Sequence, residues 1–168
     1  TATRSEMELE SASDTSHEAS LIGRGLFWQD MSVGQKFRTF TRTITEADLV
    51  HFVTLTGMVD SGFLDATASG PMGGRPVPAA LTYSIIEGFI LQTMIQGTGL
   101  AMLELHKKIL GPVVVGDTVG AEIEITALRP TSKNNRAIVT SRIDVYNQRN
   151  EMVLTYTATR MLAGRPGA

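Results

Sequence analysis

The stretch Gly70–Gln96, GPMGGRPVPAALTYSIIEGFILQTMIQ, decides the fold of this 168-residue chain. Its first nine residues hold three glycines and three prolines, a composition typical of a loop. After Pro78 the apolar residues cover most of a helical surface, which predicts a helix wrapped by other structure. We expect this central helix to run from Ala79 to about Gln96, with a length of about 27 Å.

Stretches that favour β-structure flank this predicted helix. Threonine-rich alternation before it predicts one strand, and apolar residues at every second position after it predict three or four more. The predicted strands cover Gln35–Ile44, Met102–Leu110, Val119–Thr126, Ala137–Tyr146 and Met152–Leu162. The economical solution is an α+β fold with one antiparallel sheet curled round one helix, the architecture called the hot dog.

A second, shorter helix is predicted between the first strand and the loop. Thr45 is a good N-cap residue, Asp48 completes a near capping box, and Gly57 is the expected stop. His51 on this helix is interpreted as a partly exposed residue without a chemical role. The loop that follows, Met58–Gly70, holds two aspartates that ordinary turn chemistry would explain.

Composition and length limit the possible functions. We expect a flexible acidic leader over 1–24 that is dispensable for folding, one hot-dog domain over 25–163 and a tail over 164–168. The chain has no cysteine and a formal net charge of -2, which excludes thiol chemistry and argues against nucleic acid as a partner. The three histidines are widely spaced, so no metal site is expected. Without a signal peptide or membrane span, a cytoplasmic protein is expected.

Five segments in a fixed order resemble the MaoC-like dehydratases, which include R-specific enoyl-CoA hydratases. The resemblance covers roughly Leu26 to Leu162. The segments that carry it are Phe27–Phe37 (FWQDMSVGQKF), Thr43–Gly57 (TITEADLVHFVTLTG), Gly73–Leu81 (GGRPVPAAL), Gly111–Thr118 (GPVVVGDT) and Arg129–Glu151.

The resemblance implies a ligand in which an acyl chain is linked to coenzyme A or acyl carrier protein, with no other cofactor. Members of the family add water across an α,β-double bond or remove it, using an aspartate and a histidine in the loop after the short helix. Those two positions are Met58 and Phe63 in this chain. The family also holds the thioester oxygen with a backbone N–H at the start of the central helix. The substrate-binding residues expected from this likeness are Phe63, Pro78, Ala79 and Ala80.

Three hypotheses follow. The first is an acyl-thioester-binding protein with little or no hydratase activity, which could serve as a non-catalytic subunit beside an active homologue. The second is an active hydratase or thioesterase in which Asp60 or Glu87 acts as the catalytic carboxylate. In the alternative without a catalytic role, Glu87 is a carboxylate that faces solvent or pairs with an arginine across a dimer. The third is a structural or regulatory dimer whose pocket is filled by Met58 and Phe63.

A single sheet on one helix leaves an open edge and an apolar face. We therefore expect a homodimer in which the two sheets join edge to edge, or a dimer of such dimers.

Overall fold

The computed structural model describes residues 19, 21–67 and 71–167, so most of the predicted leader lies outside the described residues. None of the described helices is both long and apolar enough to cross a membrane. The elements in chain order are η1 (Trp28–Asp30), β1 (Lys36–Arg38), β2 (Arg42–Thr43), α1 (Glu46–Thr56), α2 (Ser61–Leu64), α3 (Ala79–Gln92), β3 (Gly99–Ile109), β4 (Thr118–Pro130), β5 (Arg136–Tyr146) and β6 (Met152–Ala163).

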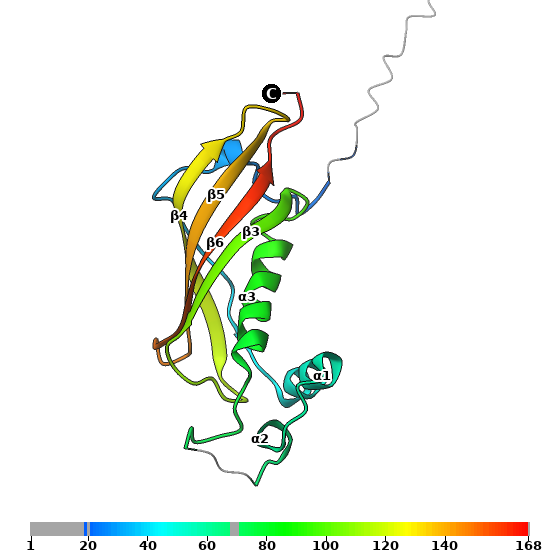
Figure 1. The fold of residues 1–168 in the computed structure, drawn as a ribbon, viewed down its shortest axis with the longest axis vertical. Coiled ribbons are helices and arrows are strands. Elements are labelled where there is room, and N and C mark those ends of the chain that lie inside the picture. The colour runs from blue at the N-terminus through cyan, green and yellow to red at the C-terminus, as the bar shows by residue number, and fades with distance from the viewer. Residues whose placement is uncertain (1–18, 20, 68–70, 168) are drawn as a thin grey trace, which may run out of the picture.

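One antiparallel sheet curls round α3 (Figure 1). Its strands lie in the order β1-β4-β5-β6-β3, and β2 also pairs with β4. Every recorded strand pairing is antiparallel. The predicted fold class, a single α+β hot-dog domain, is confirmed. Helices α1 and α2 lie at the end of the molecule where α3 begins.

The core lies between α3 and the inward side of the sheet. Ile86 and Ile90 of the helix are fully buried, as are Ile125 and Ile143 of β4 and β5. Strands β4, β5 and β6 alternate buried with less buried residues, as expected for a sheet with one face on the core. Burial of each such side chain contributes about 1.5–3 kcal/mol.

The short helix α1 begins and ends as predicted. The Thr45 hydroxyl accepts a hydrogen bond from the Asp48 N–H, and the Asp48 carboxylate accepts one from the Thr45 N–H. Burial raises the pKa of Asp48, but its hydrogen bonds to Thr45 and the nearby Arg42 guanidinium outweigh burial and lower it. Gly57 follows the helix with a φ of 73°, a left-handed conformation that glycine adopts without strain.

The strand predicted over Gln35–Ile44 is interrupted. Residues 39–41 separate β1 from β2, and Phe40 is 76% exposed. The cause of the interruption is Thr39, whose side-chain hydroxyl accepts a hydrogen bond from the Ala121 N–H at 2.8 Å. Because a backbone carbonyl would accept that bond in a regular ladder, the side-chain contact shifts the backbone out of register.

The prediction that the central helix reaches Gln96 was wrong, since α3 ends at Gln92. The Ile95 N–H donates to the Ile90 carbonyl five residues back, which widens the last turn. Gly97 then has a φ of 69°, which ends helical geometry. Residues 93–98 therefore form turns rather than a further turn of α-helix.

The helix is also less covered than predicted. Ser84 and Leu91 are exposed, and Leu91 keeps 51% of its surface accessible. Both lie on the side of α3 that faces past β3, the last strand of the sheet. In a single copy of the chain, α3 is therefore not wrapped on all sides. The sheet ends at β3 and leaves the side of the helix with Ser84 and Leu91 uncovered.

Candidate functional site

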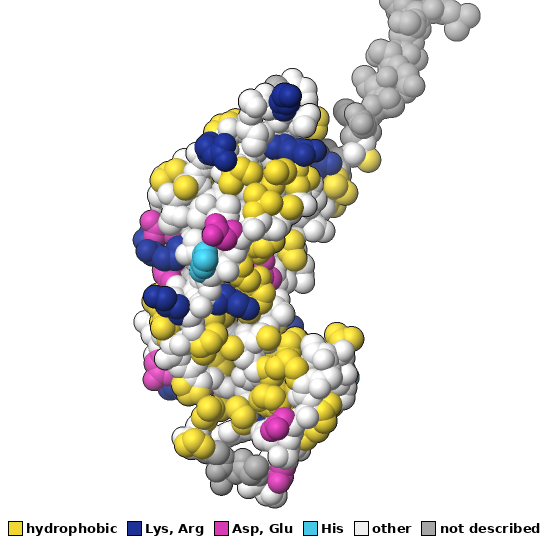
Figure 2. Space-filling view, viewed as in Figure 1, with side chains coloured by type: hydrophobic (Ala, Val, Ile, Leu, Met, Phe, Trp, Pro, Cys, Tyr) yellow, Lys and Arg dark blue, Asp and Glu magenta, His cyan; other side chains and the backbone are white. Residues whose placement is uncertain are grey.

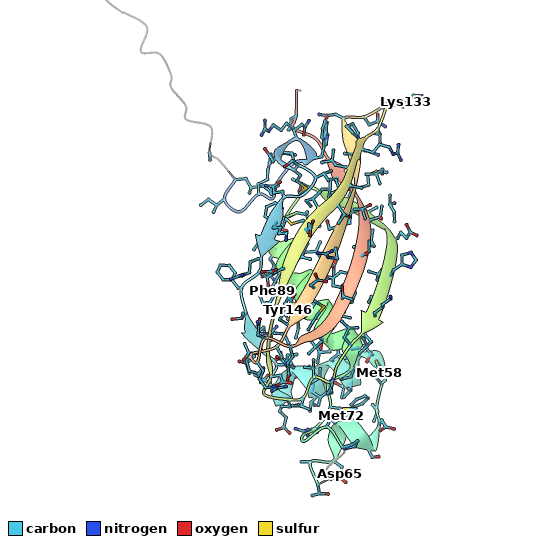
Figure 3. The ribbon with its side chains drawn as sticks, turned by 90° about the vertical axis from the view of Figure 1, so that its left-hand side faces the viewer. Met58, Asp65, Met72, Phe89, Lys133 and Tyr146 are labelled. Carbon is cyan, nitrogen blue, oxygen red and sulfur yellow. The ribbon has the colours of Figure 1, made fainter. Side chains whose placement is uncertain are left out.

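A cavity of about 320 Å³ lies at the start of α3. Figure 3 shows Met58 and Met72 at this end of the molecule. The cavity is bounded by α2, the first turn of α3, the end of β3 and the beginning of β6. Its lining residues are Phe63, Met72, Pro76, Val77, Pro78, Ala79, Thr82, Ile109, Gly111, Pro112, Val113, Val153 and Leu154. This is a largely apolar cleft of the size that binds small ligands.

The loop before α3 is fixed by backbone hydrogen bonds to the segment between β3 and β4. The Val77 N–H donates to the Val113 carbonyl at 2.8 Å, and the Val115 N–H donates to the Arg75 carbonyl at 3.0 Å. The glycine- and proline-rich loop therefore enters the helix along a defined path, which sets the position of the cavity wall.

A buried carboxylate also holds the segment between β3 and β4 in place. Asp117 is 3% exposed and accepts hydrogen bonds from the Val114 N–H at 3.0 Å and from Gln148 at 2.6 Å. Burial raises the pKa of Asp117, but the bonds from Gln148 and Val114 and the charge of Arg149 lower it overall. The fold thus stabilises the charged form of Asp117, and that charge ties the turn before β4 to the turn after β5.

Two backbone hydrogen-bond donors lie at the N-terminus of α3. The first hydrogen bonds of the helix run from the Leu81 and Thr82 N–H groups to the Pro78 carbonyl. The N–H groups of Ala79 and Ala80 precede them and have no acceptor within the helix. Together with the positive end of the helix dipole, such donors favour a partially negative oxygen. Of the predicted substrate-binding residues, Phe63, Pro78 and Ala79 line the cavity, and Ala80 lies next to them on the first turn.

The loop where the resemblance expects an aspartate and a histidine holds no proton-transfer pair at those two positions. Met58 follows the end of α1 and is 41% exposed. Phe63 lies in α2 and lines the cavity without filling it. The candidate Asp60 is exposed and caps α2, because its Oδ1 accepts the Gly62 N–H at 2.8 Å. That contact is the turn role that the sequence also allowed for Asp60.

The other candidate carboxylate, Glu87, has two buried partners on β6. Its Oε1 accepts a hydrogen bond from the Tyr156 hydroxyl at 2.7 Å and one from Arg160 at 2.5 Å. Arg160 is 4% exposed. Burial raises the pKa of Tyr156, and the negative charge and hydrogen bond of Glu87 raise it further. The arginine pair considered for Glu87 therefore exists, but within one chain.

Glu87 lines a different cavity from Phe63 and Ala79. That cavity, of about 490 Å³, lies between α3 and β3 and is bounded by apolar side chains such as Leu100 and Met102. Glu87 follows Ala79 by eight residues, which places it about 12 Å farther along the helix. The two sequence candidates Asp60 and Glu87 therefore belong to separate regions of the molecule.

Sequence reasoning missed the partners of Glu87. Tyr156 and Arg160 lie 69 and 73 residues from it in the chain. A signal was present: residues 154–162 of β6 alternate, and both partners occupy buried positions of that alternation. An arginine in a buried strand position calls for a carboxylate nearby.

Two of the three histidines, His51 and His106, lie in the part of the chain that the structure describes, and His17 lies outside it. His51 is exposed on α1, and His106 is exposed on β3, where its Nε2 lies 2.8 Å from Glu104. Among the described residues, no three His, Cys, Asp or Glu side chains are grouped to hold a metal ion.

Comparison with known proteins gives matches along most of the chain. Residues 31–156 match the family model of the FAS1-like dehydratase domain region. An (R)-specific enoyl-CoA hydratase from Aeromonas caviae is 28% identical over 128 residues, which is 76% of this chain and 92% of that protein. The MaoC-like dehydratase from Rhodospirillum rubrum superposes with a TM-score of 0.72 at 26% identity and covers 84% of this chain and 99% of its own.

A Mycobacterium tuberculosis protein with a double hot-dog fold shares the fold at 20% identity. Its TM-score is 0.73 over 86% of this chain and 46% of that protein.

Proposed function

Because the chain belongs to the FAS1-like dehydratase-region family of MaoC-like hot-dog proteins, we propose that it binds an acyl thioester without the usual hydratase chemistry. The thioester would be that of coenzyme A or acyl carrier protein. The observation that carries the proposal is the apolar cavity at the start of α3, beside the N–H groups of Ala79 and Ala80. An acyl chain fits such a lining, and the two donors suit a thioester oxygen.

The absence of hydratase chemistry is proposed from the residues near this cavity. Hydration needs a group that takes a proton from water and a group that delivers one to carbon. Met58 and Phe63 can do neither. Asp60 caps α2, and Glu87 lies on another cavity. These placements favour binding over hydration at the start of α3.

Removing one backbone donor tests the binding site. Ala79→Pro deletes the N–H at the first position of α3, where proline is well tolerated. We expect hexanoyl-CoA to bind the unchanged protein and to bind Ala79→Pro about tenfold more weakly, the loss of one good hydrogen bond. Isothermal titration calorimetry measures both affinities.

The matched control is Ala79→Val, which adds a side chain of similar size but keeps the N–H. If Ala79→Val weakens binding as much as Ala79→Pro does, the effect is steric and the donor has no role. If the unchanged protein binds no acyl-CoA or acyl carrier protein thioester, the proposed function is wrong, and a structural or regulatory dimer becomes the better account.

An enzymatic alternative rests on Glu87, which lines the larger cavity of about 490 Å³. In that case the protein would hydrolyse or hydrate an acyl thioester with Glu87 or Asp60 as the carboxylate. Thioester hydrolysis that disappears in Glu87→Gln would favour this alternative.

We further propose that the protein works as a dimer, with a second copy or with a homologous hot-dog chain. Strand β3 pairs with β6 on one side, and no described strand pairs with its other side. Leu100, Met102, Leu103 and Ile109 along it are 41–57% exposed. Figure 2 shows hydrophobic side chains gathered along this face, which is hollowed between the sheet and α1. An open apolar edge of this kind is suited to strand pairing with another chain.

A lysine on this edge should separate the subunits. Leu103→Lys places a charge at the middle of β3, where it would have to be buried in a dimer. Sedimentation should give twice 18.1 kDa for the unchanged protein and 18.1 kDa for Leu103→Lys. The control is Phe40→Lys, at an exposed apolar residue beside the opposite edge of the sheet, and this variant should stay dimeric. Unchanged mass in Leu103→Lys would show that β3 is not the interface.

A further inference from the structure

Strand β3 has a regular stretch along the edge that no described strand covers. Its pairing with β6 shifts register between Met102 and Glu104 and is then unbroken as far as Ile109. A β-bulge of this kind bends the strand and disrupts its ladder. The stretch 104–109 is therefore the part of the edge best suited to pairing with another strand.

The backbone of this stretch offers hydrogen-bonding groups to a partner. The Leu110 N–H donates to the Val153 carbonyl of β6 at 3.0 Å. Hydrogen bonds to the two neighbours alternate along an antiparallel strand, so Leu105, Lys107 and Ile109 direct their N–H and C=O groups to the open side. A second antiparallel strand would satisfy these groups.

The side chains of the same stretch form a charged row on the outer face of the sheet. Glu104, His106 and Lys108 lie opposite three threonines of β6. The Nε2 of His106 lies 2.8 Å from the Oε1 of Glu104, and the two side chains are 73% and 61% exposed. The row thus has a carboxylate at one end, a histidine in the middle and an ammonium at the other end. Such a row is complementary to a copy of itself turned by 180°.

We propose that the partner on this edge is a second copy of the same chain, paired antiparallel about a two-fold axis beside His106. Glu104 of each copy then faces Lys108 of the other, and opposite charges directly across a strand pair stabilise it. Leu105 and Lys107 exchange their backbone hydrogen bonds across the interface. This inference rests on the dimer proposed above and specifies its partner and its register.

Neighbouring registers are less favourable. Centring the pair on Glu104 or on Lys107 sets like charges opposite each other at the axis, which destabilises a strand pair. Centring on Leu105 pairs only 104–106 before Lys107 meets the bulge of the other copy. Centring on His106 pairs the whole of 104–108 in regular geometry.

The absence of cysteine from the chain makes the register testable by single substitutions. At the axis a residue faces its own copy with Cα atoms about 4.5 Å apart, within disulfide range, whereas a residue two positions away lies about 14 Å from its copy. We expect air oxidation of His106→Cys to give a covalent dimer of twice 18.1 kDa on a non-reducing gel. Glu104→Cys alone and Lys108→Cys alone should give none, and the two changes together should give one.

Charge reversal gives an independent measurement. Lys108→Glu sets two pairs of like charges across the interface and should raise the dimer dissociation constant about tenfold, measured by sedimentation. Adding Glu104→Lys to Lys108→Glu should return the constant to its original value. The matched control is Lys133→Glu, the same change in the turn between β4 and β5, which should leave the constant unchanged.

The possible results separate register from association. A dimer that Glu104→Cys or Lys108→Cys alone cross-links, or that His106→Cys does not, overturns this register and leaves the dimer through β3 in place. A mass of 18.1 kDa for the unchanged protein on its own overturns the self-pairing and leaves a homologous chain as the partner. Neither result bears on the binding of an acyl thioester at the start of α3.

Discussion

Replacing Arg160 by methionine should lower the free energy of unfolding by about 3–5 kcal/mol, the cost of leaving one charge of a buried pair alone. Arg160 and Glu87 are 4–13% exposed, and the Tyr156 hydroxyl shares the same carboxylate oxygen. Without the guanidinium, the Glu87 carboxylate stays between α3 and β6 with one neutral donor. Urea unfolding monitored by circular dichroism measures the change.

Two controls separate this effect from the loss of a surface charge or of packing. Arg142 pairs with Glu124 at 2.9 Å on the outer face of β5 and is 51% exposed, so Arg142→Met should cost at most about 1 kcal/mol. Converting the whole cluster, with Glu87→Leu, Tyr156→Phe and Arg160→Met together, should recover most of the lost stability. An Arg160→Met protein as stable as the unchanged one would show that Glu87 is not buried with its charge.

The second large effect concerns reaction rate. We expect no detectable hydration of a short 2-enoyl-CoA by the unchanged protein, followed by the loss of enoyl-thioester absorbance. Each missing proton-transfer group costs about 10²–10⁴ in rate, and the resemblance assigns both positions to Met58 and Phe63. The double change Met58→Asp and Phe63→His should restore weak hydration, because it returns an acid/base pair to the loop beside the cavity that Phe63 lines.

Hydration by the unchanged protein at a rate typical of enzymes would contradict this expectation. The single changes Asp60→Asn and Glu87→Gln would then identify the carboxylate responsible. Ala79→Pro provides a control on the rescue, since activity restored at this site should fall when the thioester donor is removed.

Local patterns predicted most of the fold. Period-2 alternation located β4, β5 and β6, and the Thr45, Asp48 and Gly57 signals located α1 to the residue. The predictions failed where a contact from elsewhere in the chain overrides propensity. The Thr39 hydroxyl breaks a strand by binding β4. The apolar pattern beyond Gln92 continues, but its residues pack into the core from turns.

The site could be predicted only as far as the resemblance placed it. Phe63, Pro78 and Ala79 do meet at one cavity. The separation of Asp60 from Glu87 depends on how α2 and α3 are placed in space, which spacing along the chain does not specify.

The two ends of the described chain lie together, far from the cavity. The Gly25 N–H donates to the Gln96 carbonyl at 2.8 Å at the far end of α3, and a Cβ on Gly25 would stand 2.4 Å from the Gln96 nitrogen. The Arg165 N–H in turn donates to the Gln29 side chain. Figure 1 shows the C-terminus at the end opposite α1 and α2. A tether attached near Gly25 or Arg165 would therefore lie away from the cavity at the start of α3 and leave it unobstructed.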